Sequence, residues 1–380
     1  MDVISILVEL IKEKYYIGMP SNSNLINKLL EFFSGYRDVQ LIPDSEGLNH
    51  LLIGLNCQLN NIDNAILLSG HMDTIKPDDS WNIDPHVDND KIYGLGSTDM
   101  KAFFAALIVN KDILLNSEIP IMMSITFDEE TLGNGIKAII EELKKRNINI
   151  SYALIGEPTR NDIVTSSRGN SVYVIQTIGK SCHSMNPENG INALYPMSHL
   201  ISYIEELNET YSGLLSLNPV LSDGGKAPNQ VCGFANMKLS IRSSNVDMRE
   251  QVLKKIQSRL KELSEKYHID TRIFPVFELK AFEQRKSDIN DSLLETLDKP
   301  EGEYLATTEA GEIQSMGVGD ITIIGPGDLA LAHKENEFCD ISQLLEYSKL
   351  LPSILGIVQS KINEKNGGLD RYEKRNKNSI

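Results

Sequence analysis

The feature that most constrains the fold is a short apolar run that ends abruptly in ionisable side chains. Residues 65–68 (Ala-Ile-Leu-Leu) read as a buried strand of an α/β sheet, and His71 and Asp73 follow shortly after it. Residues i and i+2 of an extended segment lie on the same side, so the imidazole of His71 can face a metal ion while the carboxylate of Asp73 holds the ring in one tautomer. A His-x-Asp sequence also occurs in surface turns. The motif therefore indicates a metal site only if similar stretches occur elsewhere in the chain.

Four later stretches repeat this pattern of an apolar strand followed by candidate ligands or catalytic groups. In chain order these groups are Asp99 after residues 92–98, Asp128, Glu129 and Glu130 after residues 120–127, Glu157 after residues 152–155, and His333 after residues 320–324. Asp99 has an alternative reading as the N-cap of a helix predicted from Met100 to about Leu115.

The carboxyl ends of the strands in an open α/β sheet are where ligands bind, so these groups are expected to meet. Two histidines and at least three carboxylates suit a pair of borderline divalent ions better than Mg²⁺, which prefers oxygen, or a structural zinc, which uses thiolates. Three ligating carboxylates and one bridging hydroxide carry four negative charges, which two Zn²⁺ ions cancel. One acid of residues 128–130 then remains free to act as a general base.

The length of 380 residues suits two domains. A β-α-β-β-α-β order typical of a ferredoxin-like domain is predicted from strands at 171–178, near 212–216, at 230–243 and at 269–277, and from helices at 191–207 and 247–266. We expect a catalytic domain made of residues 1–168 and 283–365, interrupted by this domain at 169–282, and a mobile tail from 366 to 380. Further elements are predicted as helices at 2–15, 22–35 and 341–362 and as strands at 38–42, 49–55 and 303–306.

Composition limits which partners the protein can bind and in which cellular compartment we expect it. The 37 basic and 53 acidic residues give a net charge of −16, which argues against nucleic acid or an anionic membrane as a partner. We find no signal-peptide pattern at the amino terminus and no apolar run long enough to span a membrane. The four cysteines are far apart and are expected to be free thiols of a cytoplasmic protein.

Taken together, five motifs resemble the dizinc deacylase and carboxypeptidase family of metallopeptidases. They are Ser-Gly-His71-Met-Asp73-Thr, Tyr-Gly-Leu-Gly-Ser-Thr-Asp99-Met-Lys, Asp-Glu129-Glu130-Thr, Ile-Gly-Glu157-Pro-Thr and Gly-Pro-Gly followed by Ala-His333-Lys-Glu-Asn-Glu. The resemblance extends to about residue 362 in the family's order. It implies an α/β fold with a zinc-peptidase-like mixed-sheet catalytic domain and an inserted ferredoxin-like α+β lid domain through which two subunits form a homodimer.

The resemblance also implies a metal-dependent mechanism with two Zn²⁺ per subunit, for which Co²⁺ or Mn²⁺ are alternatives. The implied metal ligands are His71 and Glu157 for one ion, Glu130 and His333 for the other, and Asp99 as the bridge. Asp73 is expected to orient His71. Glu129 is expected to be the general base that activates a metal-bridging hydroxide and then protonates the leaving amine.

Three residues of the inserted domain match positions that contact the substrate in the family. His183, in Ser-Cys-His-Ser, is expected to reach the partner subunit's site and polarise the scissile carbonyl. Asn229 and Arg242 are expected to hold carboxylate or carbonyl groups of the substrate.

Thr-Glu309-Ala-Gly-Glu resembles most the acetylornithine deacetylases of the family. The side-chain ammonium of ornithine needs an anionic partner, and Glu309 is a candidate; its alternative role is a structural hydrogen-bond acceptor. The resemblance implies a small N-acylated amino acid as substrate, with removal of the N-acetyl group from N2-acetyl-L-ornithine in arginine biosynthesis as the leading reading. Two alternatives stay open. One is another hydrolase of the family, acting on acetylcitrulline, succinyl-diaminopimelate or a peptide, and the other is a binding protein without turnover.

Overall fold

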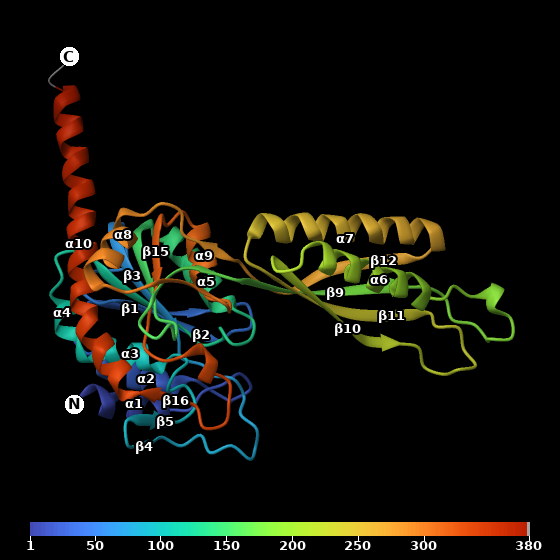
Figure 1. Ribbon diagram of the computed structural model, residues 1–380, viewed down its shortest axis with the longest axis horizontal. Coiled ribbons are helices and arrows are strands. Elements are labelled where there is room, and N and C mark those ends of the chain that lie inside the picture. Colours follow the sequence, from blue (N-terminus) through green and yellow to red (C-terminus); the bar gives the residue numbers. More distant parts are fainter. Residues whose placement is uncertain (378–380) are drawn as a thin grey trace. The chain divides into compact units, whose positions relative to one another are not determined.

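The computed structural model describes the backbone of residues 1–377 and the side chains of residues 1–366. The chain divides into two compact units (Figure 1). Unit 1 contains Met1–Ser166, Gln284–Tyr304 and the chain from Glu309 onward, and unit 2 contains Ser167–Glu283 and Leu305–Thr308. The borders lie within two residues of those expected at 168/169 and 282/283, apart from the short segment 305–308.

Unit 1 is built on a mixed sheet. Its strands run in the order β1-β2-β6-β3-β7-β15-β8, with β14 beside β8. Strand β3 is parallel to β6 and β7, whereas β2 is antiparallel to β1 and β6. The bounds are β1 (Asp38–Pro43), β2 (Asn49–Gly54), β3 (Ile62–His71), β6 (Ile121–Thr126), β7 (Ile148–Ile155), β8 (Ile163–Ser167), β14 (Glu301–Tyr304) and β15 (Asp320–Ile323), while β13 (Phe282–Glu283) is the last element of unit 2. A small sheet is formed by β4 (His86–Asp88), β5 (Lys91–Tyr93) and β16 (Phe338–Asp340). The mixed α/β sheet confirms the predicted fold class.

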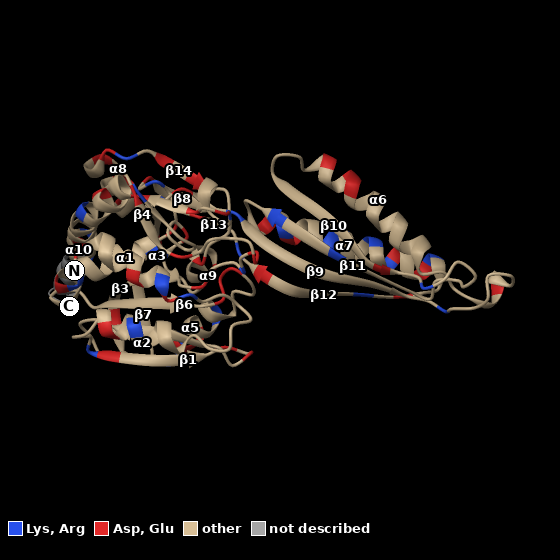
Figure 2. Cartoon of the chain, turned by 90° about the horizontal axis from the view of Figure 1, so that it is seen from below, with Lys and Arg blue, Asp and Glu red and all other residues tan. Residues whose placement is uncertain are grey.

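Helices cover both faces of this sheet. They are α1 (Val3–Lys12), α2 (Ser23–Phe32), α3 (Lys101–Val109), α4 (Lys111–Leu115), α5 (Asn134–Lys145), α8 (Asp288–Leu297), α9 (Ala310–Ser315) and α10 (Ile341–Lys377), with a 3-10 turn at Leu329–Leu331. Alternate residues of β3, such as Ile66 and Leu68, join the core with α1, α3 and α10, while α5 packs on β1, β2, β6 and β7 from the other face (Figures 1 and 2). Because the central strands are buried on both faces, each contains a continuous apolar run, such as residues 65–68 of β3.

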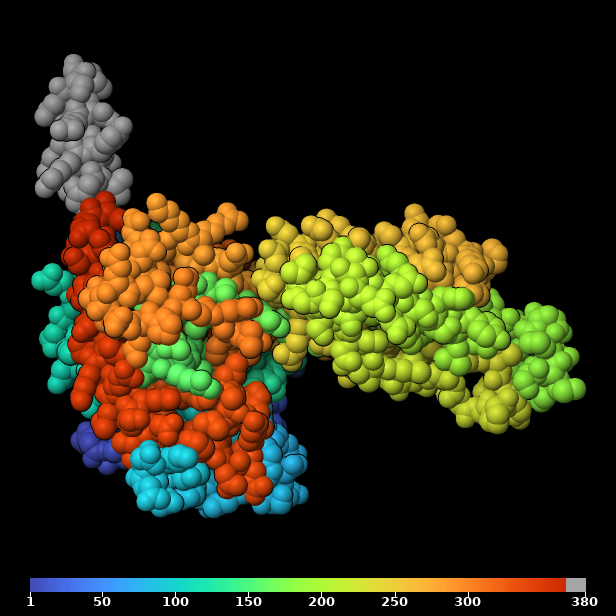
Figure 3. All heavy atoms as spheres, viewed as in Figure 1, coloured from blue at the N-terminus to red at the C-terminus, as the bar shows by residue number. Residues whose placement is uncertain are grey.

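Unit 2 has the predicted β-α-β-β-α-β order. Its elements are β9 (Gly169–Ile178), a 3-10 turn (Pro187–Asn189), α6 (Leu194–Thr210), β10 (Leu215–Gly224), β11 (Phe234–Ser243), α7 (Val246–Tyr267) and β12 (Asp270–Leu279). The four strands are antiparallel in the order β10-β11-β9-β12. Both helices pack on one face of this sheet, and residues 169–279 are the part drawn from green to amber in Figure 3. The order is that of a ferredoxin-like fold.

Three expectations about elements were wrong. The helix expected from Met100 to Leu115 is interrupted at Asn110, whose side-chain amide donates to the carbonyls of Ala106 and Ser348. Met100, not Asp99, is the N-cap position of α3, so the capping alternative for Asp99 is excluded. The strand expected near 212–216 is the ten-residue β10, an edge strand whose internal proline hides the strand signal.

The last helix extends beyond its expected end at Ile362. Its described backbone continues to Lys377, and the side chain of Lys365 forms an ion pair with Asp320 of β15 at 2.7 Å. The mobile tail expected at 366–380 lies almost entirely outside the residues with described side chains and stays a prediction. None of the described helices is long and apolar enough to cross a membrane.

Candidate metal centre

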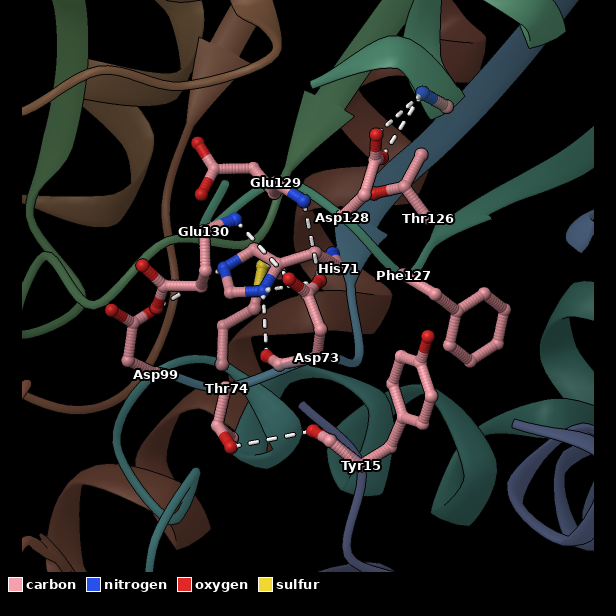
Figure 4. Close-up of polar contacts among 12 residues, drawn as sticks. Tyr15, His71, Asp73, Thr74, Asp99, Thr126, Phe127, Asp128, Glu129 and Glu130 are labelled. Carbon is pink, nitrogen blue, oxygen red and sulfur yellow. Dashed lines mark hydrogen bonds and ion pairs between the residues drawn. The ribbon is translucent and has the colours of Figure 1, made fainter. Parts of the chain in front are cut away.

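Four of the expected metal ligands meet at the carboxyl edge of the main sheet. His71 is the last residue of β3, Asp99 precedes α3, Glu130 follows β6 and His333 follows β15. His71 Nε2 lies 3.2 Å from Asp99 Oδ1, and His333 Nε2 lies 3.4 Å from Asp99 Oδ2 and 2.7 Å from Glu130 Oε1. Each oxygen of Asp99 therefore faces a different histidine. Figure 4 shows the carboxylates of Asp99 and Glu130 beside the ring of His71.

This group of side chains fits divalent cations. The ligand atoms of His71, Asp99 and Glu130 all lie within 4.8 Å of one another. Asp99 Oδ1 is buried and accepts no hydrogen bond from the described residues. Burial and the charge of Asp99 raise the pKa of Glu130. Buried acids that repel one another, with a buried oxygen that accepts no hydrogen bond, form a site that a cation would stabilise.

Glu157 and Glu129 complete the cluster of acids. Burial, followed by the charge of Asp99, raises the pKa of Glu157 to about 8, and the hydroxyl of Tyr304 donates to Glu157 Oε2 at 3.1 Å. Burial raises the pKa of Glu129 well above its usual range, and Glu157 and Glu130 add to this effect. A carboxylate with a raised pKa beside candidate ligands is suited to accept and return a proton.

Asp73 connects the end of β3 with the loop that carries the acids. His71 Nδ1 lies 3.0 Å from the backbone carbonyl of Asp73 and 3.5 Å from its carboxylate. That carboxylate accepts hydrogen bonds from the backbone N–H groups of Glu129 at 3.3 Å and Glu130 at 3.2 Å. Asp73 thus contacts two parts of the site: its backbone carbonyl lies nearest the ring of His71, and its carboxylate binds the loop that carries Glu129 and Glu130. The sequence pattern pointed only to the contact with the ring.

Sequence reasoning assigned no role to Glu337, which supports the segment of Asp99. Its buried Oε1 accepts the backbone N–H groups of Thr98 at 2.9 Å and Asp99 at 3.1 Å. Glu337 follows His333 in one of the quoted motifs, but it does not end a strand, so the strand-end pattern passed over it. Tyr304 is the last residue of β14, but a tyrosine is neither a usual metal ligand nor an acid, so it was not singled out.

Glu309 contacts β3 and β6, and both of its carboxylate oxygens accept hydrogen bonds. Ser69 of β3 donates to one oxygen and Thr126 of β6 donates to the other, each at 2.6 Å. The residue is 2% exposed, and burial raises its pKa. These contacts favour the structural alternative for Glu309 over an ion pair with substrate.

The other three predicted residues belong to unit 2 and are exposed there. His183 Nδ1 accepts the backbone N–H of Met185 at 3.2 Å, and the carbonyl of Asn229 accepts the N–H of Ser184 at 3.0 Å. The segments of His183 and Asn229 are therefore neighbours within unit 2, while Arg242 lies on β11. Their roles toward substrate stay predictions.

A model of "Peptidase family M20/M25/M40" matches residues 67–356, and the chain belongs to this family. The fold, the candidate cation site and this family match together define a metal-dependent hydrolase. It is 30% identical to an acetylornithine deacetylase of Buchnera aphidicola over 365 residues, which cover 88% of this chain and 91% of that protein.

Solved structures share the fold at low identity. One is a tripeptidase from Staphylococcus aureus, with a TM-score of 0.75, 20% identity, and coverage of 94% of this chain and 98% of that one. Another is a Bacillus subtilis protein described as a dinuclear metal-binding peptidase of the M20 family, with a TM-score of 0.68, 12% identity, and coverage of 94% and 98%.

Proposed function

We propose that this protein removes the N-acetyl group from N2-acetyl-L-ornithine, giving L-ornithine and acetate in arginine biosynthesis. The convergence of His71, Asp99, Glu130 and His333 beside Glu129 carries the hydrolase part of the proposal. The substrate rests on the similarity, over most of both chains, to a protein named acetylornithine deacetylase. We expect the enzyme to act in the cytoplasm, since its four cysteines are free thiols.

We propose two Zn²⁺ ions per subunit. His71 and Glu157 would hold one ion and Glu130 and His333 the other. Asp99 would contribute to both, since its two oxygens face different histidines. When bound, such ions polarise a carbonyl group and lower the pKa of water.

Glu129 is the proposed proton carrier of the hydrolysis. As a carboxylate it takes a proton from the attacking water, and as the acid it delivers this proton to the nitrogen that leaves as an amine. The C–N bond of the acetamide breaks, and acetate and the free α-amino group result. The buried surroundings of Glu129 raise its pKa, which favours the step in which it takes up the proton.

The inserted domain is proposed to complete the substrate site across a homodimer. His183 of one subunit would stabilise the negative charge that develops on the carbonyl oxygen in the other subunit's site, and Asn229 and Arg242 would bind the substrate. All three side chains are exposed in unit 2, as such contacts require.

Turnover of a panel of substrates tests the proposal. We would compare kcat/KM of the Zn²⁺-loaded enzyme for N2-acetylornithine, N-acetylcitrulline, succinyl-diaminopimelate and a dipeptide, with Glu129→Gln as the inactive control. We expect acetylornithine to be preferred by at least about tenfold, which corresponds to about 1.4 kcal/mol in the transition state. Preference for another member of the panel would assign that compound as the substrate instead of acetylornithine. Absence of turnover in a dimer with both metals bound would favour a binding protein.

A further inference from the structure

A second group of ionisable side chains lies outside the metal centre, around His50 of β2. His50 is completely buried, and candidate ligand atoms of Asp44, His50 and Asp128 lie within 4.8 Å of one another. Asp128 is the one acid of the 128–130 group to which neither metal binding nor proton transfer has been assigned. The question is what a buried histidine does beside the loop that carries Glu129 and Glu130.

His50 contacts this loop where the sheet ends. The antiparallel pairing of β2 and β6 ends with Leu51 opposite Ile125. Two residues further along, the backbone N–H of Phe127 donates to Nδ1 of His50 at 3.2 Å. The imidazole therefore takes the place of a backbone carbonyl where the chain leaves the sheet.

This hydrogen bond determines the tautomer of His50 and excludes a metal ion. Since Nδ1 accepts, the proton of the neutral ring resides on Nε2. Nε2 faces Oδ2 of Asp44 at 3.4 Å, an electrostatic contact that is long for a hydrogen bond. A protonated nitrogen has no lone pair for a cation, so this group of side chains is a support and not a second metal site.

The remaining anchors of the loop are equally specific. The carboxylate of Asp128 accepts the N–H groups of Asn134 at 2.7 Å and Gly135 at 3.0 Å, at the start of α5. Figure 4 shows this carboxylate pointing away from His71. A Cβ atom at Gly135 would lie 2.4 Å from the ring of His50 and 2.7 Å from Asp128, so glycine is required for this close packing.

We propose that His50 is a positioning residue for Glu129 and Glu130. It accepts the N–H of Phe127 on one side of the loop, and Asp73 accepts the N–H groups of the two glutamates on the other. Without Nδ1 of His50 as acceptor, Phe127 at the start of the loop is no longer held, and we expect the side chains of Glu129 and Glu130 to be displaced. The inference rests on the proposed function only in giving Glu129 the role of proton carrier.

Substitutions of similar size separate this role from simple packing. His50→Asn keeps a side-chain oxygen near the position of Nδ1, whereas His50→Gln carries its amide further out, near Nε2. His50→Leu removes both polar atoms. Leu52→Ala, on the same strand and also completely buried, is the control for lost stability without a lost hydrogen bond to the loop.

We would measure kcat, KM and metal content of the full-length Zn²⁺-loaded dimer, together with hydrogen exchange of the peptide 127–133. For His50→Gln and His50→Leu we expect kcat to fall about 10- to 100-fold with KM within about threefold, and the loop amides to exchange about tenfold faster. His50→Asn should regain kcat to within about threefold of the wild type, and Leu52→Ala should lower the melting temperature alone.

The proposal is overturned if His50→Gln retains the kcat and exchange rates of His50→Asn, or if Leu52→Ala reproduces the loss of kcat. Should His50→Leu fail to fold, the pair of amide variants still decides the outcome. The exchange measurement needs no substrate, so it remains decisive even if acetylornithine is not turned over.

Discussion

Replacing Asp73 by asparagine tests how the candidate metal centre is joined to the acid loop, the segment 127–133 that carries Glu129 and Glu130. The carboxylate accepts two backbone N–H groups and is completely buried. Asparagine retains one oxygen, but its amide N–H₂ must then face one of these donors. The variant therefore loses one charge-assisted hydrogen bond, makes the other a neutral one, and leaves an N–H group without a partner.

The size of the effect follows from these contacts. A hydrogen bond to a charged group contributes about 1.5–3 kcal/mol, and about 1.4 kcal/mol corresponds to tenfold in an equilibrium. The open state of the loop should become about 10- to 150-fold more populated. Because Asp73 also contacts His71, we expect metal affinity or kcat to fall by about 10- to 100-fold.

Hydrogen exchange of residues 127–133, metal analysis and kcat of the same preparation measure these quantities. Asp63→Asn is a matched control, because Asp63 is an exposed residue of β3, the strand that precedes Asp73, and its carboxylate accepts from Asn149 at 2.7 Å. It should leave all three quantities near those of the wild type. Wild-type exchange of the loop in Asp73→Asn would refute the argument that this carboxylate holds the loop, whatever happens to kcat.

Four further outcomes are expected. Chelation should abolish activity and Zn²⁺ or Co²⁺ should restore it; an active preparation with well under one metal ion per chain would contradict the site. Glu129→Gln should keep both metals while kcat falls by about 10²–10⁴, and loss of a metal would show that Glu129 and Glu130 have exchanged roles. Glu309→Gln should reduce kcat/KM equally for acetylornithine and for neutral N-acetylated amino acids, because its oxygens bind hydroxyl groups; a selective loss for acetylornithine would restore the ion-pair hypothesis. His183→Ala should lower kcat by about 10²–10³, and mixing it with Glu129→Gln chains should restore activity on subunit exchange, whereas confirmed exchange without activity would exclude action in trans.

Local patterns in the sequence were sufficient for the class of fold and for the residues that meet at the site. A strand buried on both faces is largely apolar, so the apolar stretches within β3, β6 and β7 were visible as runs, and ionisable residues shortly after such runs stood out. His71 and Glu130 were found in this way, whereas Asp99 follows the irregular segment after the short strand β5 and stood out by its position before a helix. The alternation and helical spacing of unit 2 likewise predicted its β-α-β-β-α-β order.

Only the tertiary structure decided how these residues are held. Glu337 binds the N–H of Thr98 across 239 residues, and Glu309 binds Ser69 across 240, so no local window contains both partners. The same holds for the support of the acid loop by His50 and Asp73, where the donor is a backbone N–H group that carries no sequence signature. Apolar periodicity is a property of residues that are neighbours in the sequence. The hydrogen-bond partner of a buried polar group, in contrast, depends on which distant segments the sheet brings together. Each buried polar group must bond to a donor or acceptor that the fold places beside it.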